Sequence, residues 1–200
     1  MILIRHRINS INDLLNTSSE YGVEIDLRSL GQELVLEHDP FRNGIKFYDW
    51  LKHYHHKYLI VNLKEDGLEA KAIDILKNFG IQNFFFLDQS FPALYKLSRI
   101  APEYCSARVS DFEPVSPALS LKPGWLWFDS HSGDWEYLRD AFRAIQSLNI
   151  KTCLVSPELQ RTDFDVEFVN LKTIIKEISI KFDAVCTKFP EIWSEKEFLP

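Results

Sequence analysis

The stretch Val23-Glu24-Ile25-Asp26-Leu27 alternates apolar and acidic residues, which is typical of a β-strand. Successive side chains of a strand point to opposite faces, so Glu24 and Asp26 share one face and the apolar residues share the other. In a closed barrel one face points inward and the other packs against helices, so neither face is freely solvated. Two carboxylates in such a place are unfavourable unless they are paired or bind a metal ion.

Seven further short apolar segments accompany this one along the chain. The eight segments are Ile2 to Ile4, Val23 to Leu27, Tyr58 to Leu63, Asn83 to Leu87, Cys105 to Val109, Trp125 to Phe128, Thr152 to Val155 and Ala184 to Thr187. Between them, helical spacing predicts one helix from the N-cap Ser10 to Gly22 just past its end, and others over 68–79 and 134–148.

Strands that alternate with helices through the whole chain predict a parallel sheet with helices outside it. Eight strands favour a small α/β barrel of the (β/α)₈ TIM type, and an open flavodoxin-like sheet is the main alternative. The length of 200 residues fits a single domain over 1–200. The 46% of hydrophobic and 26% of charged residues are ordinary for a soluble globular protein.

Charge and cysteine content limit the functional classes. The net charge of -6 argues against nucleic acid as the main partner, because phosphate backbones favour a basic face. Cys105, Cys153 and Cys186 are widely spaced, which indicates buried thiols in a reducing compartment. No apolar run reaches transmembrane length and no amphipathic membrane-binding segment is evident. We therefore expect a cytoplasmic protein without stable membrane association.

Polar residues follow the predicted strands at their carboxyl ends, where functional groups of parallel α/β folds gather. The candidates are His6, Arg7, His38, Asn62, Lys64, Asp129 and His131. Two histidines supply a base and an acid near neutral pH. The Glu24–Asp26 pair suits a hard cation such as Mg²⁺ or Ca²⁺. Arg7 and Lys64 would neutralise a phosphoryl group, and Asp129 and His131 are candidates for substrate specificity.

These residues resemble, in their order, the glycerophosphodiester phosphodiesterase family of the phospholipase-C-like phosphodiesterase superfamily. That family has His-Arg after its first strand, Glu-x-Asp on its second and then His-Asp, matched here by 6–7, 24–26 and 38–39. Its third strand usually ends in Glu-x-Lys, against Asn62-Leu63-Lys64 here. Its last strand reads Asp-Gly-x-x-Thr-Asp-x-Pro, against 183–190 here. The resemblance spans nearly the whole chain.

The resemblance implies a metal-dependent phosphodiester hydrolase or lyase. Because no membrane-binding amphipathic segment is evident, we expect it to act on a small polar phosphodiester. The resemblance implies one divalent cation, Mg²⁺ or Ca²⁺, with Glu24, Asp26 and Asn62 as ligands. It also implies that His6 and His38 form the acid–base pair, and that Arg7 and Lys64 contact the phosphate.

Three departures from the family pattern leave alternatives open. Ile8 stands in place of a glycine, Asn62 in place of an acidic ligand, and Lys188 in place of the closing aspartate. One alternative is a catalytically degenerate barrel with a binding or regulatory role. Another is a metal-independent lyase in which a lysine or arginine substitutes for the cation. A third, an isomerase on a similar barrel, needs only the fold. The substrate and the oligomeric state stay open.

Overall fold

Eight parallel strands form the framework of the protein in a computed structural model that describes residues 1–194. They are β1 (Ile2–Arg5), β2 (Gly22–Leu30), β5 (Leu59–Leu63), β6 (Phe84–Leu87), β7 (Ser106–Val109), β8 (Trp125–Phe128), β9 (Lys151–Val155) and β10 (Ala184–Thr187). β1 pairs with β10 on one side and with β2 on the other. The ladder continues from β2 to β5 and β6, and from β10 through β9 and β8 to β7. The eight predicted strands are confirmed.

The ring of strands is completed between β6 and β7, at a junction that we call the β6–β7 seam. Within residues 1–194, these two strands are linked by one isolated bridge between Phe86 and Cys105. The Ser106 hydroxyl adds a hydrogen bond of 2.7 Å to the Phe86 carbonyl. The seam is therefore joined by far fewer backbone hydrogen bonds than the β2–β5 ladder, which registers over five residue pairs.

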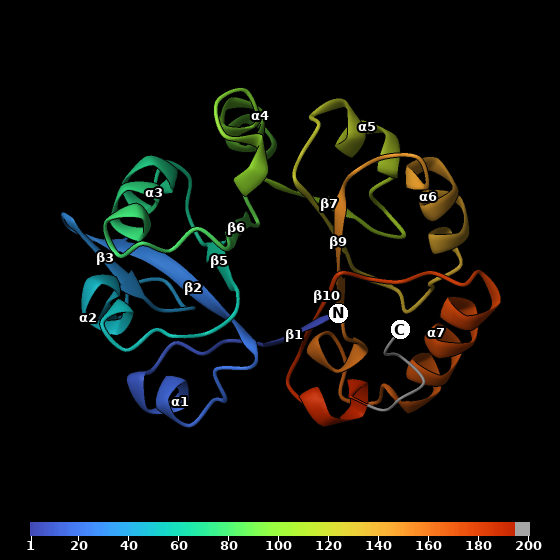
Figure 1. Cartoon of the computed structure of the whole chain (residues 1–200), viewed down its shortest axis with the longest axis horizontal. Helices are drawn as coiled ribbons and strands as arrows, with labels where there is room; N and C mark the ends of the chain where they lie inside the picture. The colour runs from blue at the N-terminus through green and yellow to red at the C-terminus, as the bar shows by residue number, and fades with distance from the viewer. Residues whose placement is uncertain (195–200) are drawn as a thin grey trace.

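A helix follows each strand of the ring and lies outside it (Figure 1). The helices are α1 (Ile11–Leu15), α2 (Phe47–Leu51), α3 (Glu69–Asn78), α4 (Phe91–Ser98), α5 (Val115–Ser120), α6 (Tyr137–Ile145), α7 (Asp165–Glu177) and the 3₁₀ helix η3 (Pro190–Trp193). Two further 3₁₀ turns, η1 (Pro102–Tyr104) and η2 (Pro157–Leu159), lie in connections. Over the described part of the chain, no helix combines the length and apolar character needed to cross a bilayer.

The first helix ends earlier than its sequence suggested. Ser10 is its N-cap, since the hydroxyl accepts a hydrogen bond of 2.9 Å from the Asp13 amide. The helix ends at Leu15, however, and Gly22 begins β2. A Cβ atom on Gly22 would lie 2.9 Å from the side chain of Ile4. The prediction of Gly22 as a helix stop was therefore wrong, because this glycine allows two strands to approach closely.

An antiparallel extension lengthens the sheet beyond the ring at β2. It consists of β3 (Glu33–Leu36) and β4 (Ile45–Lys46), with β3 paired to the second half of β2. Gly31, with a φ of +60°, occupies the left-handed region in the turn between β2 and β3. The loop from β3 to β4 carries His38.

Apolar side chains fill two separate regions, one inside the ring and one between strands and helices. The interior group is Ile4, Tyr58, Ile60, Phe85, Leu87, Trp125, Trp127, Cys153, Val155, Ala184 and Cys186. Val23, Ile25 and Leu27 belong to the outer region. Because side chains alternate along a strand, Glu24 and Asp26 point into the ring. The sequence pattern predicted that these two acids share one face of the strand.

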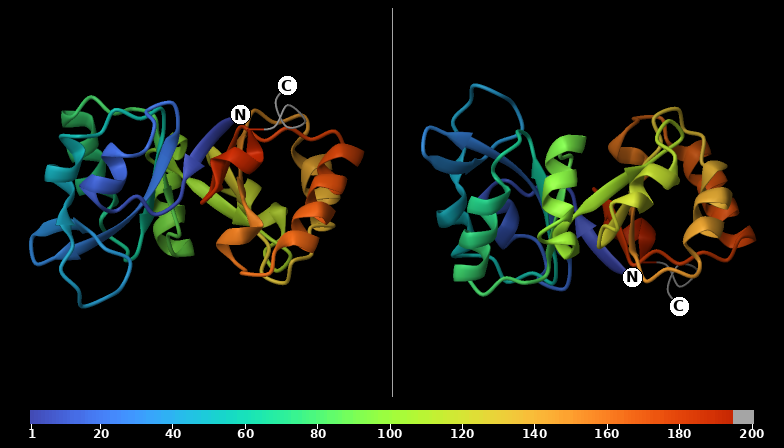
Figure 2. Two further views of the ribbon diagram at one scale, coloured as in Figure 1. Left: turned by 90° about the horizontal axis from the view of Figure 1, so that it is seen from below. Right: turned by 90° about the horizontal axis from the view of Figure 1, so that it is seen from above.

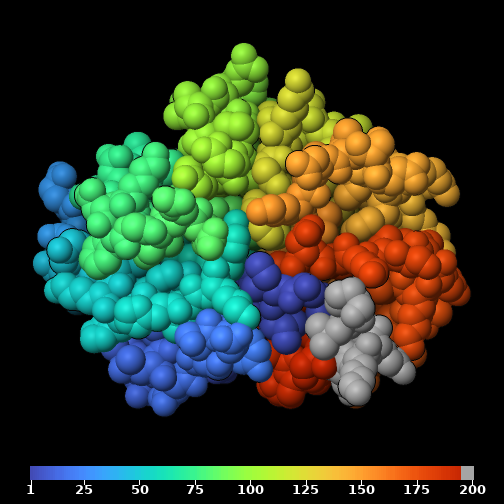
Figure 3. All heavy atoms as spheres, in the orientation of Figure 1, coloured from blue at the N-terminus to red at the C-terminus, as the bar shows by residue number. Residues whose placement is uncertain are grey.

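The two ends of the ring differ in what they present. Figure 3 looks onto the amino end, with the first residues of the chain at the centre of that face. In the side views the strands run obliquely between flanking helices, away from the N-terminus (Figure 2). The carboxyl ends of the strands therefore open on the face opposite to that of Figure 3.

Packing inside the ring predicts a large effect of Phe85 on stability. Its side chain is fully buried, and its ring centroid lies 4.8 Å from that of Trp125. We predict that Phe85→Ala lowers the free energy of unfolding by about 3–5 kcal/mol, because it leaves a cavity that the barrel cannot collapse. Urea unfolding measures this value. Phe91→Ala, at a side chain that is 60% exposed, should change it by no more than about 0.5 kcal/mol. An equal decrease in the free energy of unfolding of the two variants would contradict the burial of Phe85 inside the ring.

Candidate active site

A cavity of about 170 Å³ lies among the carboxyl ends of the strands. The predicted site residues that line it are His6, Arg7, Glu24, Asn62 and Asp129. Trp127 also lines it. Asp26 and Lys64 join the same group through Arg7, as described below. The structure thus brings together seven of the nine predicted site residues, whereas His38 and His131 lie outside this group.

Glu24 is the carboxylate that borders the cavity. It is 1% exposed, and its Oε2 accepts a hydrogen bond of 2.7 Å from the Arg7 backbone amide. The Nε2 atom of His6 lies 3.7 Å from the same oxygen. Burial, and then the neighbouring charge of Asp26, raises the pKa of Glu24 well above its usual range.

Asp26 is held by a neutral amide and two cations. Its Oδ2 accepts a hydrogen bond of 2.7 Å from the Asn9 side chain, and its backbone amide donates one of 2.8 Å to Asn9 Oδ1. Lys64 Nζ lies 2.9 Å from Oδ1, and Arg7 Nε lies 3.5 Å from Oδ2. The Asp26 side chain is 1% exposed, so these partners take the place of the water that it has lost.

His6 is a mostly buried imidazole at the end of β1. Burial, followed by the adjacent charge of Arg7, lowers the pKa of His6 from 6.5 to about 4. The ring is therefore neutral at pH 7, with one nitrogen free of a proton. A neutral imidazole at the wall of a cavity is able to accept a proton from a group bound there.

Two cavity residues have backbone angles that side chains seldom adopt. Arg7 has a φ of 57° and Asp88 a φ of 60°, both in the left-handed region. Asp88 directly follows β6, Arg7 lies two residues after the end of β1, and both line the cavity. Such angles are unfavourable outside glycine and are found more often at functional sites. The left-handed turn at Arg7 accompanies the bond from its amide to Glu24.

The oxygen atoms in this half of the site fit a hard cation. Among the described residues, Glu24 Oε1 and Asn62 Oδ1 are buried without a hydrogen-bond partner. Asn62 is registered opposite Asp26 in the β2–β5 ladder. Carboxylate and amide oxygens are the ligands that Mg²⁺ and Ca²⁺ prefer. Within residues 1–194, no three His, Cys, Asp or Glu side chains form such a cluster, so the set depends on the Asn62 amide.

In the other half of the cavity, the sequence predicted Asp129 but not Arg108 or Gln160. Arg108 of β7 forms ion pairs with Asp88 and Asp129, and its Nε lies 3.8 Å from Glu113. The Gln160 amide donates hydrogen bonds of 2.9 Å to both carboxylate oxygens of Asp129. A cation inside a short apolar strand was a signal for Arg108, whereas Gln160 lies in a connection without periodicity.

Lys188, which stands in place of the closing aspartate of the family pattern, forms hydrogen bonds with Glu158. Glu158 is 4% exposed, and its Oε1 accepts hydrogen bonds from the Thr187 hydroxyl at 2.5 Å and the Lys188 amide at 3.0 Å. Lys188 Nζ donates to the Glu158 carbonyl at 3.2 Å. A buried carboxylate from the β9 side thus holds the turn after β10.

His38 and His131 do not line the cavity. His38 is 40% exposed, and its Nδ1 lies 2.8 Å from Asp39. The Arg28 guanidinium donates two hydrogen bonds, of 3.1 and 3.0 Å, to the His38 carbonyl and so anchors the loop. His131 Nε2 lies 3.7 Å from Glu113, on the far side of Arg108.

Comparison with known proteins identifies the fold. No family model and no curated protein matches the sequence. A glycerophosphodiester phosphodiesterase from Agrobacterium tumefaciens matches the structure with a TM-score of 0.65 and 14% identity, over 96% of this chain and 97% of that chain. One from Thermotoga maritima matches with 0.67 and 15%, over 96% of each chain. A glycerophosphoryl diester phosphodiesterase from Parabacteroides distasonis matches with 0.64 and 12%, over 94% and 82%. The predicted α/β barrel is confirmed.

The buried imidazole predicts a pH dependence of stability. The unfolded chain protonates His6 near pH 6.5, whereas the folded protein does so only at about pH 4. The unfolded state therefore binds more protons between these values, and stability from this residue is lost as the pH falls through the window. Relative to His6→Asn, the wild type should lose about 3 kcal/mol between pH 6.5 and 4.

Urea unfolding of both proteins in EDTA, at several pH values, measures this difference. The exposed His53, changed to Asn, is the matched control and should follow the wild type. The raised pKa of Glu24 acts with the opposite sign, which is why the comparison is made between variants. Parallel pH profiles for the wild type and His6→Asn would show that His6 titrates normally.

Proposed function

We propose that this protein cleaves phosphodiesters, as a hydrolase or a cyclising lyase, in the cavity that contains His6. One observation carries the proposal. At the carboxyl ends of the barrel strands, the neutral imidazole of His6 lies beside the Glu24 carboxyl group, and the cations Arg7 and Lys64 lie close by at Asp26. The similarity of the fold to three structures named as glycerophosphodiester or glycerophosphoryl diester phosphodiesterases supports the same reaction class. The resemblance in sequence motifs points the same way.

Cleavage forms a bond between phosphorus and the oxygen of water or of a neighbouring substrate hydroxyl, and breaks the bond to the leaving alcohol. One histidine accepts the proton of the attacking oxygen, and the other donates a proton to the leaving oxygen. We assign these roles to His6 and His38 as a pair. Because His38 does not line the cavity, its part requires its exposed side chain to turn toward the substrate.

The cationic side chains bind the phosphoryl oxygens in this proposal. Arg7 is about half exposed and Lys64 mostly buried, and both face Asp26. As charge develops on the phosphoryl oxygens, a guanidinium and an ammonium held in place stabilise it. Asp129, which Arg108 and Gln160 hold across the cavity, orients the rest of the substrate.

Glu24, Asn62 and Asp26 would hold one divalent cation, Mg²⁺ or Ca²⁺. The two buried oxygens of Glu24 and Asn62 support this assignment. When bound, the cation would neutralise charge on the phosphoryl group. Lys64 would then leave Asp26 and become free to contact the phosphate.

One observation favours a second candidate, a metal-independent reaction. Lys64 Nζ already lies 2.9 Å from Asp26 Oδ1, where it places a positive charge beside the predicted ligands. Asn62 in place of an acidic ligand lowers the negative charge that would attract a divalent cation. In this version Lys64 and Arg7 alone neutralise the phosphate.

The cellular setting belongs to the same proposal. Cys105, Cys153 and Cys186 are free and buried. Unpaired thiols are typical of a reducing compartment, which supports a cytoplasmic enzyme acting on a small-molecule diester.

We predict metal-dependent hydrolysis of a phosphodiester panel that includes a chromogenic diester, measured with Mg²⁺, Ca²⁺, Mn²⁺ or EDTA. His6→Ala should lower kcat/KM by about 10²–10⁴-fold, because it removes the proton acceptor. The exposed His53→Ala is its matched control and should retain activity. Turnover that survives EDTA would favour the metal-independent candidate. A folded protein without turnover under any condition would favour a binding or regulatory barrel.

Asn62 allows the metal assignment to be tested without activity. Asn62→Asp adds a negative charge beside Glu24 and Asp26, and should tighten Ca²⁺ or Mg²⁺ binding by about tenfold or more in calorimetric titrations. Asn78→Asp adds the same charge at the exposed end of α3 and should leave the Kd unchanged. Equal affinity in the wild type and both variants would mean that the cation is not held at Asn62.

A further inference from the structure

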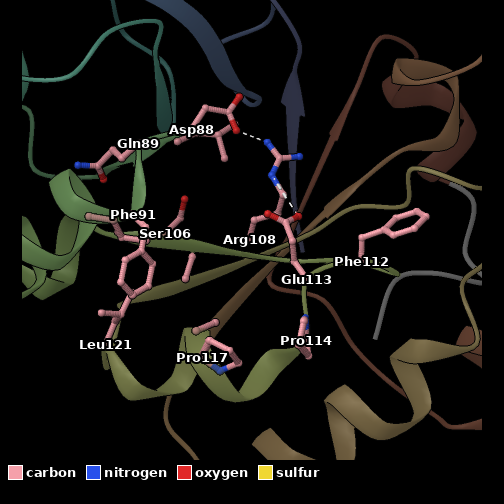
Figure 4. A pocket seen from close by; sticks show the side chains of 14 residues that line it. Asp88, Gln89, Phe91, Ser106, Arg108, Phe112, Glu113, Pro114, Pro117 and Leu121 are labelled. Atoms are coloured by element: carbon pink, nitrogen blue, oxygen red, sulfur yellow. Dashed lines mark hydrogen bonds and ion pairs between the residues drawn. The ribbon is translucent and has the colours of Figure 1, made fainter.

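A second cavity, of about 410 Å³, lies between α4 and α5 and adjoins the candidate active site (Figure 4). We call it the α4–α5 groove. It shares Leu87, Asp88 and Arg108 with the first cavity, so the two spaces meet along these side chains. A molecule bound at His6 could therefore extend past these side chains into the groove.

The groove exists because the barrel wall is thin at the β6–β7 seam. α4 follows β6 and α5 follows β7, so these helices flank the seam with its single bridge between Phe86 and Cys105. The residues of β7 and α5 that face the groove include the small Ala107 and Ala118. Because these side chains of β7 and α5 are small, they leave part of the space between α4 and α5 unfilled.

The lining of the groove away from Arg108 is mainly apolar. Leu94, Pro117 and Leu121 form its walls, and Phe91 and Phe112 also contribute. Phe91 is 60% exposed and Phe112 is 71% exposed. An apolar ligand would gain free energy by covering these surfaces, at roughly 0.8 kcal/mol for each methylene group buried. The groove is therefore suited to an uncharged, apolar group.

Arg108 marks the border between the two cavities. Figure 4 shows its guanidinium directed toward Asp88 and Glu113 at the edge of the groove. With Asp129 included, three carboxylates surround this one cation. The formal charge at the border is thus negative, which repels a phosphate group. The phosphate is expected on the other side, beside Arg7 and Lys64, and the part of the substrate at Arg108 is not anionic.

We propose that the α4–α5 groove binds an apolar alkyl or aryl substituent of the phosphodiester whose phosphate lies beside His6. This assignment rests on the proposed function and specifies its substrate class. The expectation of a polar diester came from the lack of a membrane-binding segment, which concerns the protein's location and not the shape of the pocket. The substrate is then a diester with one polar and one apolar alcohol.

The test uses diesters that join glycerol 3-phosphate to methyl, butyl, hexyl, octyl or benzyl alcohol. With the wild type, kcat/KM should rise by about fourfold for each added methylene until the groove is full. The benzyl diester distinguishes aryl from alkyl preference. Pro117→Trp fills the groove and should abolish this rise, while the methyl diester is cleaved as before. Ser116→Trp, on the exposed side of the same helix, is the matched control and should keep the rise.

Phe91→Ala, at an exposed position, is a second variant that does not depend on placing a large residue in α5. It should reduce the gain between butyl and octyl diesters severalfold. Cleavage of the methyl diester with no dependence on chain length would overturn the groove assignment and leave the proposed function intact.

Binding separates the two proposals if no diester is cleaved. Calorimetry with methyl and octyl diesters should give tighter binding and a more negative heat-capacity change for the octyl diester, and Pro117→Trp should remove both differences. That result would uphold the groove while the proposed reaction fails. Equal binding of the two diesters to the wild type would overturn the groove assignment whatever the activity.

Discussion

The burial of Glu24 and Asp26 on the inward face of one strand is the constraint on which the site depends. Two carboxylates separated by a single residue repel each other, and neither reaches water. The protein compensates them differently. Asp26 is surrounded by two cations and an amide, whereas Glu24 accepts a bond from the Arg7 backbone. Arg7 takes part in both arrangements, which links the left-handed turn after β1 to the charge balance of β2.

The opposite wall of the cavity reverses this pattern. There three carboxylates surround Arg108, while on the first wall two cations surround Asp26. The cavity is electrically polarised, because the formal charge around Arg108 is negative whereas Arg7 and Lys64 balance the two carboxylates of the first wall. A ligand with one charged and one uncharged end would bind it in a single orientation. The first wall comes from residues 6–64 and the second from residues further along the chain, and the barrel brings the two face to face.

Much of the fold was predictable because the strands are buried on both faces. That burial makes each strand a short apolar run, and β2 stands out by its alternating acids. Arg7 and Lys64 were predictable since they follow the ends of strands, and Glu24 was predictable from the alternation in β2. The contacts of Gln160 and Glu158 were not, because they lie in connections where no period constrains the sequence. Gly22 was misread because a glycine that relieves close packing and one that ends a helix look alike in sequence.

The pairing of β1 between β2 and β10 also bears on how the chain is made. β10 is the last strand of the ring to be synthesised, so β1 leaves the ribosome long before one of its two partners exists. Until then its edge carries unsatisfied backbone groups that are open to pairing with another chain. The pairing of β1 with β10 joins residues that are far apart in the sequence, such as Ile2 and Ala184, and contacts of this kind are among the slowest to form. The ring of strands therefore cannot be completed until β10 has been synthesised.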